Sequence, residues 1–200
     1  MFILNGVFTA FDVYTSSEYR YAYTLEDWPT TFEMVSQFFF FLFVEDTAFF
    51  WSHYLFHSPK LYWIHKQHHE YNITITLAAT YAHPIEYLLG NGLPFGIGYR
   101  ILCGFTKVHL VTIMVWTVYR LLETCEGHSG YAWTWGQLGF VPWKLGSEYH
   151  DFHHSANVGN YGSQFGFWDN FMQTNSHYKK AKMITNKTSW NRSEHNKFYK

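Results

Sequence analysis

An uninterrupted apolar run lies within residues 31–56, which we predict to form one helix. Apolar side chains fill positions 38–44, and two acidic residues and then two histidines follow them. Thr30 or Thr31 can cap the start of this helix, because a threonine hydroxyl accepts a hydrogen bond from a free backbone N–H, and Glu33 suits the first turn. The predicted helix therefore has an apolar first half and a second half that carries chemistry.

A second apolar stretch covers residues 87–122, with Arg100 and Lys107 among its few charged residues. At about 1.5 Å per residue it is long enough for two short spanning or half-spanning helices, and residues 104–107 would make the turn between them. A hairpin returns the chain to the side from which it left. The segments before and after this one are therefore expected on the same face of a membrane.

The remaining chain predicts shorter elements. Residues 131–146 are rich in tryptophan and glycine, which is typical of an irregular or interfacial segment, and residues 150–154 suit a short helix or turn. Turn-forming residues make 157–163 a loop. No linker interrupts the sequence, so we expect one domain over residues 1–200. Its expected fold is all-α, an integral membrane helical bundle with a cytosolic histidine-rich cap that holds a di-metal site.

The composition favours a membrane setting. Aromatic residues make up 22% of the chain and charged residues only 14%, whereas about 25% charged residues are usual in a soluble domain. Residues 176–200 form a basic tail in which Glu194 is the one acidic residue. By the positive-inside rule this tail is cytosolic, although a solvated terminus explains it equally well. No recognition motif accompanies the tail, so we expect no nucleic-acid partner.

Three clusters of histidines have a spacing that indicates a metal site. They are His53 with His57, then His65, His68 and His69, and then His150, His153 and His154. Residues three or four apart lie on one face of a helix, so each cluster directs its imidazoles to one region. Imidazole is a good ligand for iron, zinc, copper and nickel. Because these ligands are too many for one ion, we predict two metals.

The ordered motifs resemble those of the fatty acid hydroxylase and sterol desaturase superfamily, and within it they are most similar to those of the methylsterol monooxygenases. The motifs are HxxxH at 53–57, HxxHH at 65–69 and a second HxxHH at 150–154. Further stretches carry the resemblance over roughly residues 45–178: IHKQHHEY (64–71), YAHPIEYLLG (81–90), RLLETCEGHSGY (120–131), GSEYHDFHH (146–154) and GNYGSQFGFWDNF (159–171).

The resemblance implies a set of iron ligands with supporting carboxylates. The implied ligands are His53, His57, His65, His68, His69, His150, His153 and His154, with His128 as a ninth and His83 as a tenth that would otherwise line the substrate cavity. The expected supporting residues are Asp46, Glu123 and Asp151. Asp46 lies two helical turns before His53, so it can accept the second N–H of a ligand imidazole. The ordinary alternative for such a carboxylate is a helix cap or an ion pair.

The resemblance also implies a function, that of a non-haem di-iron membrane monooxygenase that oxidises a sterol, foremost its 4-methyl group. Such an enzyme holds two iron ions, which zinc can replace in a purified sample, and uses dioxygen with reducing equivalents from NAD(P)H. A cytochrome-type electron donor or its reductase would deliver the electrons. The expected location is the endoplasmic reticulum membrane, with several membrane passes and a cytosolic active site.

Two alternatives stay open at the level of sequence. Another sterol or lipid desaturase or hydroxylase of the superfamily would use the same ligands, because the pocket decides the substrate. A catalytically silent structural subunit of a membrane protein complex would keep the fold without turnover. Family members carry more chain ahead of the 31–56 helix, which favours the subunit, whereas the intact histidine motifs favour the enzyme.

Overall fold

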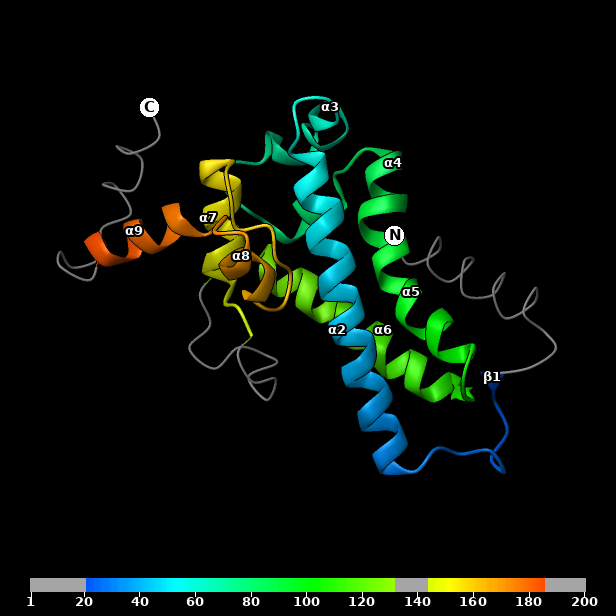
Figure 1. Ribbon diagram of the computed structural model, residues 1–200. Coiled ribbons are helices and arrows are strands. Elements are labelled where there is room, and N and C mark those ends of the chain that lie inside the picture. The colour runs from blue at the N-terminus through cyan, green and yellow to red at the C-terminus, as the bar shows by residue number, and fades with distance from the viewer. Residues whose placement is uncertain (1–20, 132–143, 186–200) are drawn as a thin grey trace.

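The computed structural model describes residues 21–131 and 144–185, which are mostly helical (Figure 1). The helical elements are α2 (Thr31–Phe56), α3 (Tyr62–His65), η1 (His68–Glu70), η2 (Thr76–Thr80), α4 (Pro84–Glu86), η3 (Tyr87–Gly92), α5 (Leu93–Cys103), α6 (Leu110–Gly127), α7 (Ser147–Ala156), α8 (Phe167–Phe171) and α9 (Ser176–Thr185). Two short strands, β1 (Tyr21–Ala22) and β2 (Val108–His109), pair in parallel. The helical character predicted from the sequence is confirmed for this part of the chain.

Helix α2 begins at the predicted position, and its cap is Thr30. The Thr30 hydroxyl accepts from the backbone N–H of Glu33 at 3.2 Å, and the Glu33 carboxylate accepts from the backbone N–H of Thr30 at 2.8 Å. This reciprocal pair satisfies two backbone donors that a helix start leaves without an intrahelical partner. The capped helix then runs through the middle of the molecule, as Figure 1 shows.

The hydrophobic core lies where α2 meets α5 and α6. Its centre is made of large side chains with almost no exposed surface: Phe41 and Leu42 of α2, Tyr99 of α5, and Ile113 and Trp116 of α6. The Trp116 indole also donates to the Phe95 carbonyl at 3.2 Å, so its one polar atom is paired inside the core. Burial of this aromatic cluster fixes the angle at which the three helices cross.

The predicted hairpin forms, with α5 and α6 on either side of the turn after Cys103. Helix α5 has 11 residues, about half of what a full membrane span needs. Among the residues that the structure describes, α2 alone is both long and apolar enough to cross a bilayer. The outer faces of the helices are nevertheless apolar, with Phe39 and Phe43 of α2 and Val115 and Val118 of α6 exposed.

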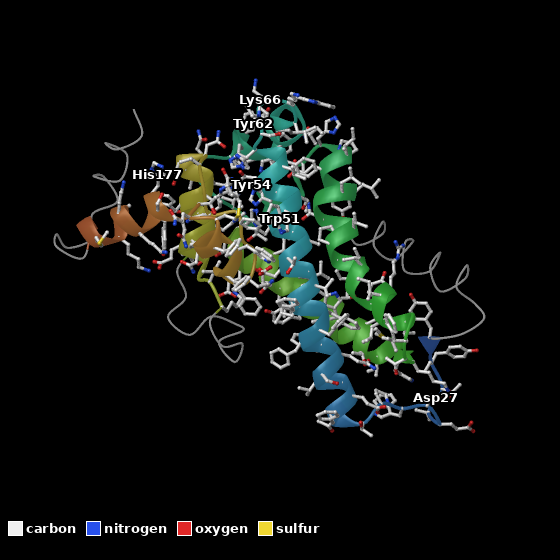
Figure 2. All side chains as sticks on the ribbon, viewed as in Figure 1. Asp27, Trp51, Tyr54, Tyr62, Lys66 and His177 are labelled. Atoms are coloured by element: carbon white, nitrogen blue, oxygen red, sulfur yellow. The ribbon has the colours of Figure 1, made fainter. Side chains whose placement is uncertain are left out.

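The histidine-bearing segments gather at the C-terminal end of α2. Tyr54, Tyr62 and Lys66 lie at this end, and Asp27 lies at the opposite one (Figure 2). Of the predicted irregular segment 131–146, residues 132–143 lie outside the described residues. The first part of the basic tail forms α9, whose Tyr178 hydroxyl donates to the Glu148 carboxylate of α7 at 2.8 Å.

Packing at Gly98 gives a stability prediction. A Cβ at Gly98 of α5 would lie 3.1 Å from the Phe41 Cα, whereas a Cβ at Gly92 would meet only the Tyr87 carbonyl oxygen at 3.5 Å. Ala is favoured over Gly in a helix by about 1 kcal/mol, and overpacking costs about 1–3 kcal/mol. Gly98→Ala should therefore lower the melting temperature in detergent, while Gly92→Ala leaves it equal or raises it. Equal melting temperatures for the two variants would show that α2 and α5 do not pack this closely.

Candidate metal centre

Nine imidazoles converge in two neighbouring groups at the end of α2. The five-histidine group contains His53, His57, His65, His69 and His153, and the four-histidine group contains His68, His128, His150 and His154. Within each group the possible ligand atoms all lie within 4.8 Å of one another. The structure thus brings together nine of the ten histidines that the sequence singled out, and it divides them between two sites.

The HxxHH motif explains this division. In 65–69 the outer pair, four residues apart, joins the five-histidine group, and His68 between them joins the other. In 150–154 the outer pair joins the four-histidine group, and His153 joins the first. Side chains four apart share a face of a helical turn, whereas successive residues are about 100° apart, so the histidine before the last points elsewhere. The expectation that each cluster directs all its imidazoles to one region is therefore corrected for the two HxxHH motifs. Each motif therefore contributes to both groups.

Distances inside the groups fit metal coordination. Neighbouring Nε2 atoms of the five-histidine group are 3.0–3.2 Å apart, and those of the four-histidine group 2.9–3.4 Å. With metal–nitrogen bonds of about 2.0–2.1 Å, ligands of one ion are about 2.9–3.4 Å apart in common geometries. The distances between the nitrogens therefore match the edges of such coordination polyhedra.

Hydrogen bonds on the outer side of the rings fix which nitrogen faces inward. The Nδ1 atom of His53 donates to the Tyr161 carbonyl at 2.9 Å, that of His128 to the Thr124 carbonyl at 3.0 Å, and that of His154 to the Tyr71 carbonyl at 3.1 Å. A neutral imidazole has one N–H, so Nε2 of each of these rings carries a lone pair. Such lone pairs repel one another at 3 Å unless a cation lies between them, so the residues present fit two metal ions.

Burial keeps the imidazoles in their neutral, metal-binding form. Desolvation lowers the pKa of His57 to about 3, with a smaller contribution from the neighbouring His68. It also lowers the pKa of His68 to about 4 and that of His128 to about 3. A protonated imidazole would place a positive charge in a low-dielectric site, and neutral imidazole is the form that binds transition metals.

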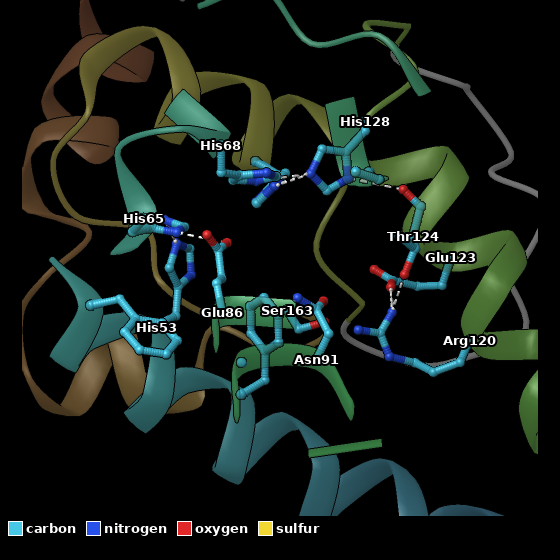
Figure 3. A pocket seen from close by; sticks show the side chains of 16 residues that line it. His53, His65, His68, Glu86, Asn91, Arg120, Glu123, Thr124, His128 and Ser163 are labelled. Atoms are coloured by element: carbon cyan, nitrogen blue, oxygen red, sulfur yellow. Dashed lines mark hydrogen bonds and ion pairs between the residues drawn. The ribbon is translucent and has the colours of Figure 1, made fainter. Parts of the chain in front are cut away.

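The carboxylate that supports an imidazole is Glu86, which the sequence analysis did not select. Its Oε1 atom accepts from Nδ1 of His65 at 2.8 Å, and both side chains are buried (Figure 3). An acceptor of this kind orients a ligand ring and raises its basicity. The available signal was a single acidic residue directly ahead of the apolar stretch 87–122, because an acid in that setting needs a buried partner.

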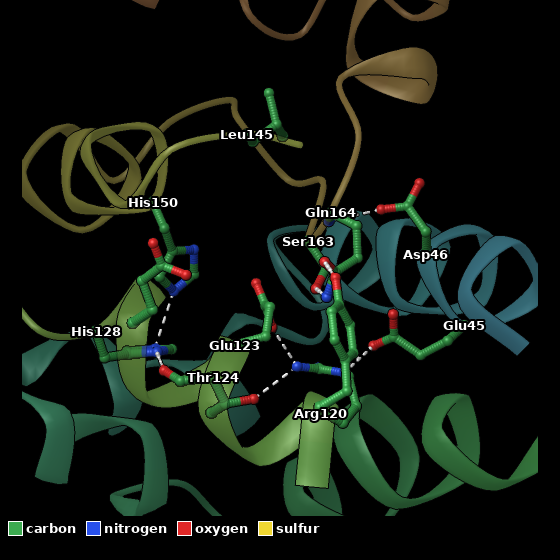
Figure 4. Close-up of polar contacts among 12 residues, drawn as sticks. Glu45, Asp46, Arg120, Glu123, Thr124, His128, Leu145, His150, Ser163 and Gln164 are labelled. Atoms are coloured by element: carbon green, nitrogen blue, oxygen red, sulfur yellow. Dashed lines mark hydrogen bonds and ion pairs between the residues drawn. The ribbon is translucent and has the colours of Figure 1, made fainter. Parts of the chain in front are cut away.

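The three carboxylates that the sequence pointed to have other partners. Asp46 accepts from the backbone N–H groups of Gln164 at 2.7 Å and Phe165 at 3.0 Å, and Asp151 accepts from the Thr74 hydroxyl at 2.8 Å. Glu123 pairs with Arg120, which also bonds Glu45 at 2.7 Å (Figure 4). Their partners in the structure are thus backbone N–H groups, a hydroxyl and a guanidinium, and the alternative of an ion pair describes Glu123.

His83 belongs to neither group. It stands at the N-cap of α4, where Nδ1 accepts from the backbone N–H of Ile85 at 3.2 Å. Its ring packs edge-on against Trp63, with ring centres 5.4 Å apart. Because Pro84 begins the helix directly after it, the His83 side chain is used to cap that helix and is turned away from the two histidine groups.

A loop held by two buried carboxylates positions two ligands. The Asp169 side chain accepts from the backbone N–H groups of Tyr161 at 2.9 Å and Gly162 at 2.7 Å. Asp46 accepts from Gln164 and Phe165 further along the same loop. Carbonyl groups of this loop accept from His53 and His153. At Gly159 the backbone has a φ of +68°, and a Cβ would collide with the Thr174 carbonyl, so only glycine fits there.

A small cavity of about 50 Å³ adjoins both histidine groups (Figure 3). His53 and His65 line it from the first group, and His68, His128 and His150 from the second. The remaining wall combines the apolar Phe49, Phe56 and Ala79 with hydrogen-bonding side chains, among them Glu86, Asn91, Glu123 and Ser163. A molecule in this cavity would therefore contact side chains of both histidine groups.

Comparisons with known proteins agree with this site. The family model described as fatty acid hydroxylase matches residues 38–174. The chain is 40% identical over 157 residues to the C-4 methylsterol oxidase erg25 of Schizosaccharomyces pombe, covering 77% of this chain and 52% of that protein. It is 37% identical over 158 residues to methylsterol monooxygenase 1 of Danio rerio, covering 78% and 52%.

The chain is also 39% identical over 160 residues to the very-long-chain aldehyde decarbonylase GL1-8 of Oryza sativa subsp. japonica, covering 77% of this chain and 57% of that protein. It thus spans about half the length of the curated relatives that it matches. No solved structure matches the chain.

The division of ligands predicts metal stoichiometry. Purified protein should hold about two metal ions per chain. The double variant H65A/H69A removes two ligands of the five-histidine group, and H68A/H150A removes two of the four-histidine group. Each should lower the content measured by elemental analysis to about one ion per chain. His83→Ala should keep the full content, and a metal content below one in the unmodified protein would contradict the assignment.

The clamped loop predicts a selective effect. Asp169→Asn keeps the size of the side chain, but the amide cannot accept every bond that the carboxylate accepts. Since the loop supports His53 and His153, metal affinity should fall by about 10- to 100-fold at the five-histidine group and stay unchanged at the four-histidine group. Competition with a chelator measures the metal affinity of each of the two groups. Glu148→Gln, on the outer side of α7, is the control, and equal weakening of both groups would disprove the selectivity.

Proposed function

Because the chain belongs to the fatty acid hydroxylase family, we propose that it is a non-haem di-iron membrane monooxygenase that oxidises a sterol, foremost at its 4-methyl group. The observation that carries this proposal is the pair of histidine groups on one cavity. An all-imidazole ligand set suits iron. The similarity to a C-4 methylsterol oxidase and a methylsterol monooxygenase supports the choice of substrate.

Iron ions bound in the two groups would supply the activation of dioxygen and the oxidation of a C–H bond. Burial holds the imidazoles neutral, and outer hydrogen bonds aim Nε2 atoms inward on the rings of His53, His65, His128 and His154. Fixed ligand positions need no reorganisation when charge changes at the centre, which is the general benefit of a preorganised site.

The cavity sets how a substrate can approach. A water molecule needs about 10–15 Å³ of such space, so about 50 Å³ admits a methyl group and its immediate neighbours and excludes a whole ring system. The apolar wall of Phe49, Phe56 and Ala79 favours a hydrocarbon and limits the entry of water. The rest of a sterol would lie outside the cavity, against the apolar surface of the helices.

The buried ion cluster closes the cavity on the side of α6. Arg120 is paired with Glu45 and Glu123 and also donates to the Thr124 hydroxyl at 2.6 Å. Both carboxylates are thereby bound to a guanidinium next to the histidine groups and are kept away from the ligand set. This leaves the candidate centre with neutral ligands and a full positive charge, which favours anionic oxygen species.

The cellular setting of the proposal is the endoplasmic reticulum membrane, with several passes and the active site facing the cytosol. The apolar outer faces of α2 and α6 and the basic tail support it. The electrons would come from NAD(P)H through a cytochrome-type donor or its reductase, either of which could reach a cytosolic site. Membership in a larger membrane protein complex is compatible with this setting.

A second candidate function is the conversion of a long-chain aldehyde. It is favoured by the 39% identity to a very-long-chain aldehyde decarbonylase. The same histidine groups would serve it, and the narrow cavity would receive the end of a chain instead of the corner of a ring. A silent structural subunit, the third reading, would leave the intact ligand set without a use.

Complementation separates these functions. Cells that lack their own C-4 methylsterol oxidase cannot convert 4-methylsterols. Expression of the unmodified chain should restore this conversion, as measured by the 4-methylsterol content of lipid extracts. His153→Ala and His68→Ala each remove a ligand of one metal and should reduce this activity by at least about 100-fold, because both metals face one cavity.

The control is His177→Ala, an exposed residue of α9 far from the histidine groups (Figure 2), which should restore activity fully. Full activity of both ligand variants would show that the chain acts as a subunit. Conversion of a long-chain aldehyde without any change in sterols would select the second candidate.

A further inference from the structure

Asn91 reaches the cavity because the chain makes a π-helical turn. The segment η3 (Tyr87–Gly92) is π-helical, and the backbone N–H of Leu93 bonds the carbonyl of Leu88, five residues back. In an α-helix, residues five apart point in clearly different directions, since a turn takes 3.6 residues. A turn closed by bonds between residues five apart brings Asn91 back to the side of Glu86. Both side chains line the cavity.

The turn is held against the end of α2 by a glycine. A Cβ at Gly90 would lie 2.9 Å from a ring carbon of Phe56, so the turn packs directly on the aromatic ring that forms part of the cavity wall. A π turn is rare and is often found at functional sites. The π turn lies between Glu86 and the core helix α5, so this irregular turn is located at the cavity itself.

Two polar groups of this wall have hydrogen-bonding capacity that the protein does not use. Glu86 is only 4% exposed, and while Oε1 accepts from His65, its Oε2 has no partner among the described residues. The Asn91 carboxamide likewise makes no hydrogen bond within the described part of the chain. An unpaired buried atom such as Glu86 Oε2 is costly, whereas Asn91 is half-buried. The placement of both groups beside the cavity indicates that a ligand completes them.

We propose that Glu86 and Asn91 bind a hydroxyl group of the substrate that lies two carbons from the oxidised methyl group. This inference rests on the proposed sterol oxidation. A hydroxyl can donate to Oε2 of Glu86 and accept from the Asn91 amide, so one group satisfies both. In a 4-methylsterol, the 3-hydroxyl stands at this distance from the 4-methyl carbon. The methyl group would then face the histidines, while the hydroxyl is held by Glu86, which lies beside His65, and by Asn91 (Figure 3).

The pair would act as a specificity determinant. A cavity with an entirely apolar wall would accept any hydrocarbon of the right width, whereas a site with unpaired polar atoms penalises a substrate that cannot satisfy them. Binding of a hydroxyl next to the reacting carbon also fixes which C–H bond faces the metals. Glu86 has the added role of orienting His65, so Asn91 is the residue at which substrate recognition can be tested separately.

The test compares two probes, a 4,4-dimethylsterol with a 3-hydroxyl and the same sterol without it. Equilibrium binding to the full-length, iron-loaded protein is measured without dioxygen, so that no turnover occurs, and kcat/KM is then measured with dioxygen. The unmodified protein should prefer the hydroxylated sterol by about tenfold or more in both measurements, given the usual contribution of one or two hydrogen bonds.

Asn91→Leu has a similar volume but no hydrogen-bonding group, and it should reduce this preference to about threefold or less at unchanged iron content. The smaller Asn91→Ala should do the same and serves where leucine does not fit. Leu89→Ala changes an exposed side chain of the same turn and should keep the full preference, which separates recognition from damage to the turn.

The outcomes distinguish this inference from the proposed function. An unmodified protein that oxidises both sterols equally, or Asn91 variants that retain the full preference, would overturn the role of Asn91 and leave sterol oxidation in place. A protein that binds neither sterol but binds a long-chain aldehyde would overturn both.

Discussion

The fold depends on one constraint, that nine neutral imidazoles with inward lone pairs must be held within a few ångströms of each other. Without a cation this arrangement is repulsive, and without the outer hydrogen bonds the rings would be free to turn. The helices, the clamped loop and the carboxylate of Glu86 all help to hold the imidazoles in these positions. Metal binding and folding of this end of the molecule are therefore expected to be linked, because the metal supplies the interaction that the ligands lack.

Two kinds of buried charge stabilise the surroundings of the site. Asp46 and Asp169 accept from backbone N–H groups and so fix the course of the loop that carries the ligand supports. Arg120 with Glu45 and Glu123 joins α6 to α2 beside the cavity. A buried pair of this type adds little net stability over apolar packing, but removal of one partner is strongly destabilising. We infer that the cluster is used for geometry and for the charge balance near the metals.

The sequence predicted the features that depend on local spacing. The helix over 31–56 and its threonine cap follow from the apolar run and from Glu33, and the break between α5 and α6 follows from the polar residues around Lys107. The convergence of the histidines follows from their three- and four-residue spacing. The carboxylate partners could not be predicted, because Glu86 meets His65 across 21 residues of chain. The role of His83 stayed open at the level of sequence because a helix cap and a ligand look the same in a motif, and the π turn leaves no periodic signal.

The alternating use of the HxxHH motifs makes the two metal sites mechanically dependent. The segment 65–69 and helix α7 each place rings in both groups, so ordering of either group also orders part of the other. Binding of the first ion orders the two segments. Less conformational entropy is therefore lost when the second ion binds. The second ion should accordingly bind to a site that is already partly ordered, although each group has enough ligands of its own to hold an ion alone.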